Sequence, residues 1–272
     1  MNQDERLDYI VDTLKEDSQN YKNMEVPRQD RRMIMRSLMN IRLPKPIDKE
    51  FLDIQDKYLS EEAKKKGIVK LHDISTIKET YGNTHIHADK ISIWQGDITR
   101  LATAGIVNAA NSQMLGCFVP CHKCIDNAIH SAAGIELRAA CNQYMKEKRN
   151  RYGRDYEEPT GSAVVTLGYN LPAKYVLHTV GPIVSWKVTE KHKTDLKNCY
   201  KSCLEAALKH GMRSIAFCCI STGEFHFPND KAAKIAVETV IEFLEENNTE
   251  FDRIIFNVFK DLDKEIYEKL LA

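Results

Sequence analysis

The sequence predicts an α/β fold, with helices on both faces of a sheet, preceded by an N-terminal helical extension. From Ile91 onward, short apolar segments with the character of strands alternate with longer segments of helical periodicity, a pattern typical of α/β sheets. The first eighty or so residues show helical periodicity without a strand pattern. We therefore divide the chain into an extension, residues 1–82, and a sheet domain, residues 83–272.

Composition sets limits on the class of protein. The 272 residues suffice to bury most of the apolar surface. The 39 basic residues balance 39 acidic ones, and no basic stretch is interleaved with aromatics, so neither nucleic acid nor membrane is expected as a partner. The N-terminus is polar and has no apolar stretch after it, which predicts neither a secretory signal nor a transmembrane span and therefore a cytoplasmic protein.

Apolar residues recur at helical spacing in the extension. They are Leu7, Ile10, Val11 and Leu14, and again Phe51, Ile54 and Tyr58. Pro44 and Pro46 break this pattern, and Gly67 is a plausible helix stop. Three roles stay open for the extension: shielding a site, binding a partner, or stabilising the fold.

In the sheet domain, apolar segments predict strands at residues 91–94, 163–167, 175–180, 214–220 and 253–258. Helical patterns cover residues 125–133, 135–148, 195–210, 231–246 and 264–271. Residues 147–158, rich in arginine, tyrosine and acids, are predicted to form a surface loop around Gly153. Ligands of such sheets bind at the carboxyl ends of the strands.

Thiol and imidazole groups crowd residues 117–124, just past a segment of small residues, 107–112, that we interpret as a turn. Cys117, His122 and Cys124 are soft and borderline ligands, which suit zinc. Three protein donors leave one tetrahedral position for water or substrate, as in catalytic zinc sites. The segment therefore predicts one zinc ion per chain and a hydrolytic function.

Two other interpretations of these cysteines stay open. One is burial, because free cysteine is often an apolar core residue. It explains Cys199 and Cys203 on one helix face, and Cys218 and Cys219 in a predicted buried strand, and we interpret those four as structural. The other is a closed structural zinc with Cys121 as fourth ligand, although the adjacent residues Cys121 and His122 rarely converge on one ion.

Polar residues at the predicted strand ends could contact a ligand, but each of them could instead have only a structural role. Asp97 can cap the next helix or accept a hydrogen bond from a purine amino group. Asn108 and Asn111 can contact sugar hydroxyls or only satisfy turn backbone. The backbone amides of residues 221–228 can cradle phosphate oxygens, although many loops of this composition bind nothing.

Four motifs in order carry a family resemblance. They are Gly96-Asp97-Ile98-Thr99, Val107-Asn108-Ala109-Ala110-Asn111, His178-Thr179-Val180-Gly181-Pro182 and Ser221-Thr222-Gly223. Over about residues 85–272 this arrangement resembles the macrodomains, an ADP-ribose-binding family. The cysteine and histidine insertion, followed by residues 125–130, resembles the bacterial zinc-dependent, sirtuin-associated branch that has an N-terminal helical extension.

The resemblance implies a three-layer α/β/α sandwich with a mixed central sheet, and it assigns contacts. Asp97 and the Ile98 amide are expected to meet adenine, Asn111 the distal ribose, and zinc the reactive sugar. The diphosphate contacts are expected from Ser221, Thr222, Gly223, Glu224 and Phe225. Many macrodomains have glycine where this chain has His226, so His226 is not included among the contacts.

The implied function is a zinc-dependent hydrolase that removes mono-ADP-ribose from modified proteins, through an ester bond to an acidic side chain. Asp126 would orient water or ribose, or alternatively cap the helix beside it, and His130 would pack internally. The competing functions are a reader that binds ADP-ribose without cleavage and a deacetylase of O-acetyl-ADP-ribose. Some members are encoded beside a sirtuin-like transferase and a lipoyl-carrier protein like glycine cleavage protein H, which implies such a carrier as substrate.

Overall fold

The structure, a computed structural model, describes residues 1–247 and 251–272 and contains two compact units. We call the first the helical unit: Met1–Gly67, Met114–Tyr156 and Tyr169–Leu171. The second is the sheet unit: Ile68–Gln113, Glu157–Gly168 and Pro172–Ala272. Each unit consists of three separate segments of the chain, so no single boundary in the sequence divides the two. The predicted boundary between residues 82 and 83 stays a prediction.

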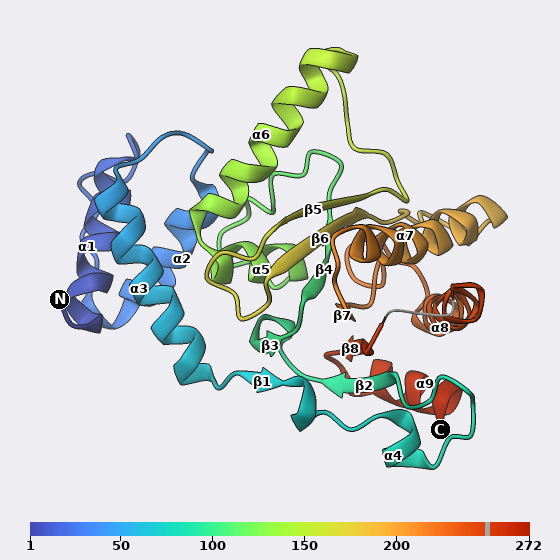
Figure 1. Ribbon diagram of the computed structural model, residues 1–272. Coiled ribbons are helices and arrows are strands. Elements are labelled where there is room, and N and C mark those ends of the chain that lie inside the picture. The colour runs from blue at the N-terminus through green and yellow to red at the C-terminus, as the bar shows by residue number, and fades with distance from the viewer. Residues whose placement is uncertain (248–250) are drawn as a thin grey trace. The chain divides into compact units, whose positions relative to one another are not determined.

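The sheet unit is built on a six-stranded sheet in the order β2-β8-β7-β4-β6-β5 (Figure 1). Its strands are β2 (Ile91–Gln95), β4 (Gly105–Ala110), β5 (Ala163–Leu167), β6 (Tyr175–Val180), β7 (Ser214–Phe217) and β8 (Arg253–Val258). All neighbours are parallel except β5, which is antiparallel to β6. The predicted α/β class with a mixed sheet is therefore confirmed.

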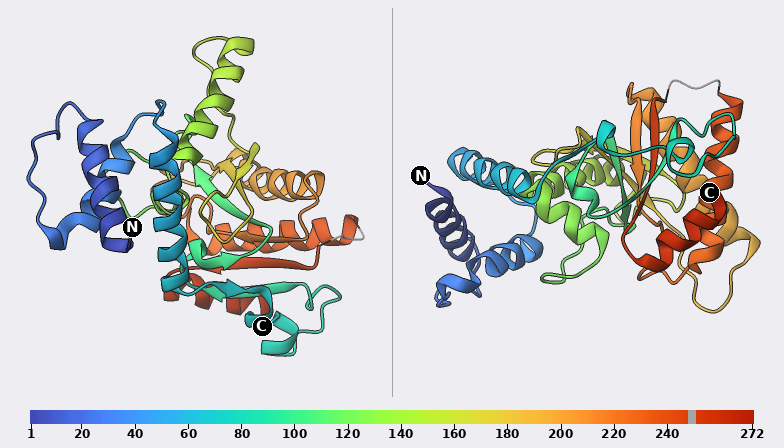
Figure 2. Two further views of the ribbon diagram at one scale, coloured as in Figure 1. Left: turned by 60° about the vertical axis from the view of Figure 1, so that its left-hand side comes forward. Right: turned by 90° about the horizontal axis from the view of Figure 1, so that it is seen from below.

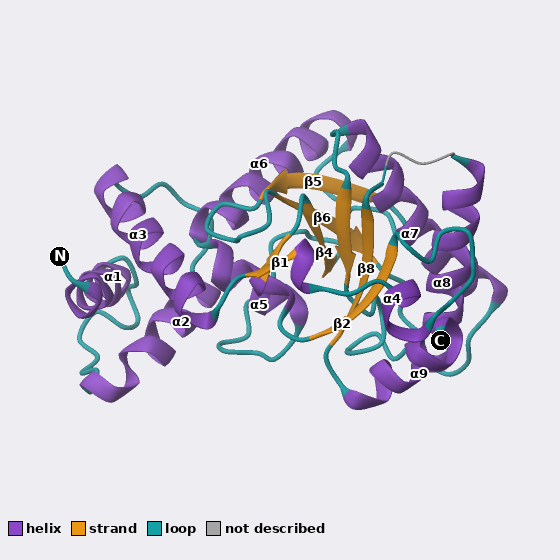
Figure 3. Ribbon diagram, turned by 60° about the horizontal axis from the view of Figure 1, so that its bottom comes forward, coloured by secondary structure: helices purple, strands orange, loops and turns teal. Residues whose placement is uncertain are grey.

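Helices of the sheet unit flank these strands, as Figure 3 shows in purple and orange. They are α4 (Ile77–Tyr81), α7 (Glu190–Lys209), α8 (Asn229–Glu246) and α9 (Asp261–Leu271). Helix α7 packs on β5, β6 and α8, whereas α9 packs on β2, β8 and α8. The two-residue strands β1 (Val69–Lys70) and β3 (Leu101–Ala102) pair separately, so one short strand interrupts the stretch predicted to be helical only.

Strand β4 corrects the prediction of a turn at residues 107–112. Gly105–Ala110 form a strand that pairs with both β6 and β7, and only Asn111 and Ser112 lie beyond it. Small residues suit turns, but here they form an interior strand whose neighbours lie close on both sides. The prediction was wrong because composition alone does not show the burial of a strand.

The helical unit contains α1 (Gln3–Glu16), α2 (Arg31–Ile41), α3 (Lys49–Lys66), α5 (Ile125–Ala133) and α6 (Ile135–Tyr152). The predicted apolar residues of α1 and α3 form its core together with Met35, Leu38 and Met39 of α2. The two views of Figure 2 show these N-terminal helices, in blue, packed together. Gly67 ends α3 at a φ of 84°, as predicted for a helix stop.

Several boundaries differ from those predicted, among them the start of α7, at Glu190 where residue 195 was predicted, and two more concern α6 and β7. Helix α6 continues to Tyr152 and ends at Gly153, with a φ of 109°, so the predicted loop at 147–158 is helical in its first half. Strand β7 ends at Phe217, which places Cys218 and Cys219 after the strand. In both cases packing extended or shortened an element whose type was predicted correctly.

None of the helices in residues 1–247 and 251–272 is both long and apolar enough to cross a membrane.

Candidate functional site

Three of four adjacent parallel strands of the sheet unit carry the predicted ligand contacts at their carboxyl ends. Asp97 follows β2, Ser221 follows β7 and Asn111 follows β4, with β8 between β2 and β7. The carboxyl ends of parallel strands meet at one edge, and strands lie about 4.8 Å apart, so this edge extends about 14 Å from β2 to β4. The expected adenine, diphosphate and ribose contacts therefore follow one another along the edge.

Asp97 caps the short 3-10 helix at Ile98–Arg100. Its Oδ1 accepts hydrogen bonds from the Thr99 backbone N–H, at 3.0 Å, and from the Thr99 hydroxyl, at 2.7 Å. The cap interpretation is therefore confirmed, and contact with a purine stays a prediction. Both bonds use Oδ1, so they fix the orientation of the half-buried carboxylate at the strand end.

Phe259, after β8, is a candidate that the sequence analysis missed. Its side chain is 74% exposed, and its carbonyl accepts a hydrogen bond from the Gln95 side chain at 3.4 Å. The Gly96 N–H donates to the Val258 carbonyl at 3.0 Å, which places Phe259 beside the strand end that carries Asp97. An exposed aromatic face at such a position can stack on a base. The available signal was a large apolar residue directly after an apolar strand.

The loop after β7 holds two non-glycine residues in left-handed backbone conformation, Ser221 at a φ of 66° and His226 at 55°. Each costs about 1–2 kcal/mol relative to the right-handed region, and such strain clusters at functional loops. The turn is closed by bonds from the Phe227 N–H to the Ser221 carbonyl and from the His226 N–H to the Gly223 carbonyl. A Cβ on Gly181 would lie 2.1 Å from Ser221 Oγ and 3.0 Å from Ile220 Cγ2, so a larger residue there would displace the Ser221 side chain.

Asn111 and Asn108 have different surroundings. Asn111 is half-buried and follows β4 directly, and its Oδ1 accepts from the Gln113 N–H at 3.0 Å, as expected for a residue that satisfies turn backbone. Its contact with a sugar stays a prediction. Asn108 is fully buried within β4, and its Nδ2 lies 3.1 Å from His178 Nδ1. The suggested sugar contact of Asn108 is therefore wrong, because the residue belongs to the interior of the sheet.

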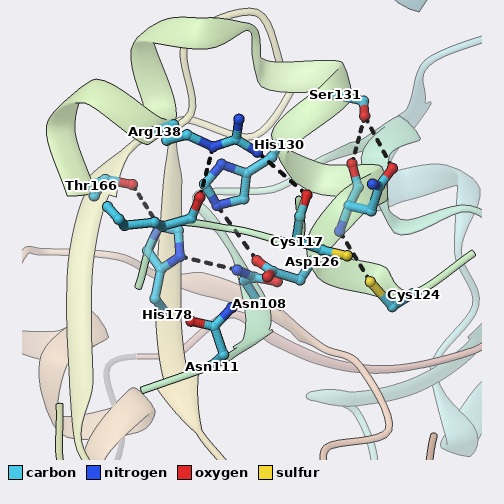
Figure 4. A network of polar contacts seen from close by, with 12 residues as sticks. Asn108, Asn111, Cys117, Cys124, Asp126, His130, Ser131, Arg138, Thr166 and His178 are labelled. Atoms are coloured by element: carbon cyan, nitrogen blue, oxygen red, sulfur yellow. Dashed lines mark hydrogen bonds and ion pairs between the residues drawn. The ribbon is translucent and has the colours of Figure 1, made fainter. Parts of the chain in front are cut away.

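His178 on β6 is held between two polar side chains (Figure 4). Its Nδ1 faces Asn108, and its Nε2 lies 2.9 Å from Thr166 Oγ1 on β5. Complete burial lowers the pKa of His178 to about 3, so the ring is neutral at physiological pH.

The His178 ring makes stability pH-dependent. The unfolded chain binds a proton near pH 6.5 and the folded chain does not, so its contribution is complete above pH 6.5 and is lost as pH falls toward 3. We expect the free energy of unfolding to fall by about 1.4 kcal/mol between pH 7.5 and 5.5 from this group. Urea unfolding measures it, and His178→Gln should remove the increment whereas His226→Gln should keep it. An unchanged pH slope in His178→Gln would contradict this account.

The helical unit brings together the predicted metal ligands. The ligand atoms of Cys117, His122 and Cys124 all lie within 4.8 Å of one another. Tetrahedral zinc with Zn–S bonds of about 2.3 Å holds two sulfurs about 3.8 Å apart, so the three donors fit the ion after a small approach. Burial raises the pKa of the Cys124 thiol to about 12, and the Asn127 N–H that donates to its sulfur opposes this shift.

Cys121 points elsewhere. Its Sγ lies 3.2 Å from Ser37 Oγ and 3.5 Å from the Met33 carbonyl, both on α2, and its φ is 51°. The group formed by the donor atoms of Cys117, His122 and Cys124 does not include it.

Asp126 lies in the first turn of α5, but it does not cap that helix. The N-cap is Cys124, whose Sγ accepts from the Asn127 N–H at 3.4 Å, so the capping alternative for Asp126 is wrong. Asp126 is only 5% exposed, and its Oδ1 lies 3.5 Å from Nε2 of the buried His130, one turn along the helix (Figure 4). His130 therefore has the internal role predicted for it.

The cysteines interpreted as structural are largely buried. Cys199 and Cys203 lie on the inner face of α7 and are inaccessible, as is most of Cys218. Burial raises the pKa of Cys199 to about 11 and that of Cys218 to about 12. Cys219 is half-buried, and its thiol lies 3.8 Å from the Asn257 carbonyl.

Comparison with known proteins places this arrangement in a family. A family model described as Macro domain matches residues 107–236. A protein of Treponema medium named protein-ADP-ribose hydrolase is 46% identical over 274 residues, and the alignment covers 100% of both chains. The chain belongs to the macrodomain family. The predicted fold class, a macrodomain with a mixed sheet and a helical N-terminal extension, is thereby confirmed.

The chain is also similar to a second bacterial protein and to a macrodomain of known structure. A protein-ADP-ribose hydrolase of Staphylococcus aureus strain MSSA476 is 40% identical, over 97% of this macrodomain and 94% of the relative. The crystal structure of a Trypanosoma brucei macrodomain in complex with ADP-ribose is 30% identical, with a TM-score of 0.65 over 87% of this chain and 95% of that one.

Proposed function

We propose that this macrodomain is a zinc-dependent hydrolase that removes mono-ADP-ribose from modified proteins, at an ester bond to an acidic side chain. The observation that carries the zinc dependence is the mutual approach, within 4.8 Å, of the donor atoms of Cys117, His122 and Cys124. Full-length similarity to proteins named protein-ADP-ribose hydrolase supports the reaction class. Simple recognition of ADP-ribose does not require such a group of donors.

ADP-ribose would bind along the carboxyl edge of the sheet. The fixed carboxylate of Asp97 and the Ile98 amide would meet adenine, and Phe259 would stack on it. Ser221, Thr222, Gly223, Glu224 and Phe225 would surround the diphosphate, and Asn111 would reach the distal ribose. The complex of the similar Trypanosoma brucei macrodomain with ADP-ribose supports this ligand.

In the reaction, this chain would hold the metal and control a proton. Cys117, His122 and Cys124 would bind zinc, which supplies Lewis acidity to polarise an ester oxygen or lowers the pKa of a bound water to about 7. The buried Asp126 carboxylate, paired with His130 at 3.5 Å, would orient the attacking water and accept its proton at a carboxylate oxygen. Water would add to the ester carbonyl, the bond between that carbon and the ribose oxygen would break, and the proton taken up by Asp126 would pass to the ribose oxygen.

The protein partners follow from the same resemblance. We infer that the substrate is an ADP-ribosylated protein in the cytoplasm, with a lipoyl carrier like glycine cleavage protein H as the first candidate. A sirtuin-like transferase would add the group that this hydrolase removes. Comparing ADP-ribose release from a modified lipoyl carrier and from an unrelated modified protein tests this choice, and equal rates would count against it.

Two substitutions test the adenine end of the proposed site. Asp97→Ala should weaken ADP-ribose binding by about 1–3 kcal/mol, because the adenine would lose a hydrogen-bond partner. Phe259→Ala should cost about 1–3 kcal/mol through lost stacking. Isothermal titration calorimetry measures both, with zinc content as the control that should not change. Unaltered affinity in both variants would mean that the adenine site is elsewhere.

A further inference from the structure

We propose that helix α2 is part of the metal-binding apparatus, and that Arg36 is a positioning residue for the loop that carries Cys117, His122 and Cys124. The inference rests on the proposed zinc binding and deepens it. It gives a function to the N-terminal helices, for which the sequence left three roles open. Helix α2 and this loop both belong to the helical unit.

Arg36 contacts the loop at a metal ligand itself. Its Nη2 donates to the backbone carbonyl of His122 at 3.1 Å. The same guanidinium donates to Asn127 Oδ1 twice, from Nη2 at 2.7 Å and from Nε at 3.2 Å. Because the guanidinium is planar and rigid, these three bonds fix where the His122 backbone lies relative to the start of α5.

Asn127, which Arg36 holds in place, is itself hydrogen-bonded to two other residues of the loop region. It is fully buried, and its Nδ2 donates to the Val119 carbonyl at 3.0 Å. Its backbone N–H donates to Cys124 Sγ at 3.4 Å. A hydrogen bond to a ligand sulfur stabilises the thiolate and orients it, and partners of this kind control metal affinity. Arg36 therefore acts on one ligand directly and on a second through Asn127.

One turn further along α2, Asn40 holds the middle of the same loop. Its Oδ1 accepts from the Cys121 N–H at 2.9 Å, and its Nδ2 donates to Ser131 Oγ at 2.9 Å. Cys121 has a left-handed backbone, φ 51°, which costs energy unless its surroundings enforce it. Residues four apart share a helix face, so α2 presents Arg36 and Asn40 together to the loop.

Arg138 of α6 connects the end of α2 to the start of the loop. It is 4% exposed and donates to the carbonyls of Met39 and Asn40, at 2.9 and 2.8 Å, and to that of Leu115 at 2.7 Å. Its guanidinium also lies 4.3 Å from the Phe118 ring. The loop is thus held at several points by α2 and by a residue bound to α2.

The test compares zinc affinity in full-length variants by competition with a chromophoric chelator. Arg36→Ala should raise the zinc dissociation constant about 10- to 100-fold, as removal of such partners does elsewhere. Arg36→Lys keeps the positive charge but not the several N–H donors of the planar guanidinium, and it should raise the zinc dissociation constant less. The control is Arg32→Ala, which removes an exposed arginine of the same helix and its ion pair with Glu62. It should leave zinc affinity unchanged.

A second readout separates loop order from general unfolding. In the reduced, metal-free chain, iodoacetamide should modify Cys117 and Cys124 several-fold faster in Arg36→Ala than in Arg32→Ala, by mass spectrometry. The inaccessible Cys199 should stay unmodified in both, and if Arg36→Ala exposes it, the comparison is made with Arg36→Lys.

The outcomes distinguish the two proposals. No zinc in the wild type would overturn the zinc-dependent function and this inference with it. Zinc bound by the wild type and equally tightly by the folded Arg36→Ala and Arg36→Lys variants would overturn this inference alone. Weaker zinc binding together with faster modification of Cys117 and Cys124, and with Cys199 protected, is the result expected here.

Discussion

Replacement of His122 by alanine should reduce release of ADP-ribose from a modified protein to below about 1% of the wild-type rate, because Lewis acidity is worth several kcal/mol in such reactions. Much of the affinity for free ADP-ribose should persist, since the proposed contacts with adenine and diphosphate come from Asp97 and the 221–225 loop. The variant should thus lose hydrolysis of the modified protein while it still binds free ADP-ribose. Calorimetry and release of ADP-ribose from ester-linked protein measure the two.

The His122 comparison needs two controls. Circular dichroism must show that the variant is folded, because loss of a metal can cost folding free energy. Lys123→Ala, at the adjacent exposed position, should keep both zinc and activity. A folded, zinc-free variant that cleaves at the wild-type rate would show that the metal is not catalytic. A wild type that binds ADP-ribose but releases none would favour the reader, and activity on O-acetyl-ADP-ribose alone would favour the deacetylase.

Elemental analysis of protein purified without added metal should find about one zinc per chain, and Cys117→Ala combined with Cys124→Ala should remove it. Two of the three donors are then missing, and one imidazole does not retain zinc through purification. Cys121→Ala is the matched control: its thiol faces Ser37 on α2, so zinc should remain. Zinc kept by the double variant would contradict the ligand assignment. Zinc lost in Cys121→Ala would favour a closed structural site.

Segments with strong local patterns were predicted closely. The strands at 163–167, 175–180 and 253–258 have the predicted bounds, and so does helix α5. The three strands are apolar segments and α5 has helical periodicity, and a glycine, proline or polar residue stands at a boundary of each. Such signals depend on neighbours in the chain, so they can be read before any packing is known.

The wrong or missing predictions concern features that depend on contacts between distant parts of the chain. The small residues of β4 were taken for a turn because burial between β6 and β7 has no local signal. Cys124, a weak hydrogen-bond acceptor, occupies the N-cap that seemed suited to Asp126. Phe259 was missed because an exposed aromatic is ordinary until the neighbouring strand end is known.

The sequence alone was sufficient for the α/β class, the order of the motifs and the identity of three clustered donors, since all of these lie in short segments of the chain. Which distant residues meet was decided by the tertiary structure. Asn108 pairs with His178, 70 residues away, and Arg36 reaches Asn127, 91 residues away. Buried polar groups must find partners wherever the folded chain brings them, and no local pattern specifies those partners.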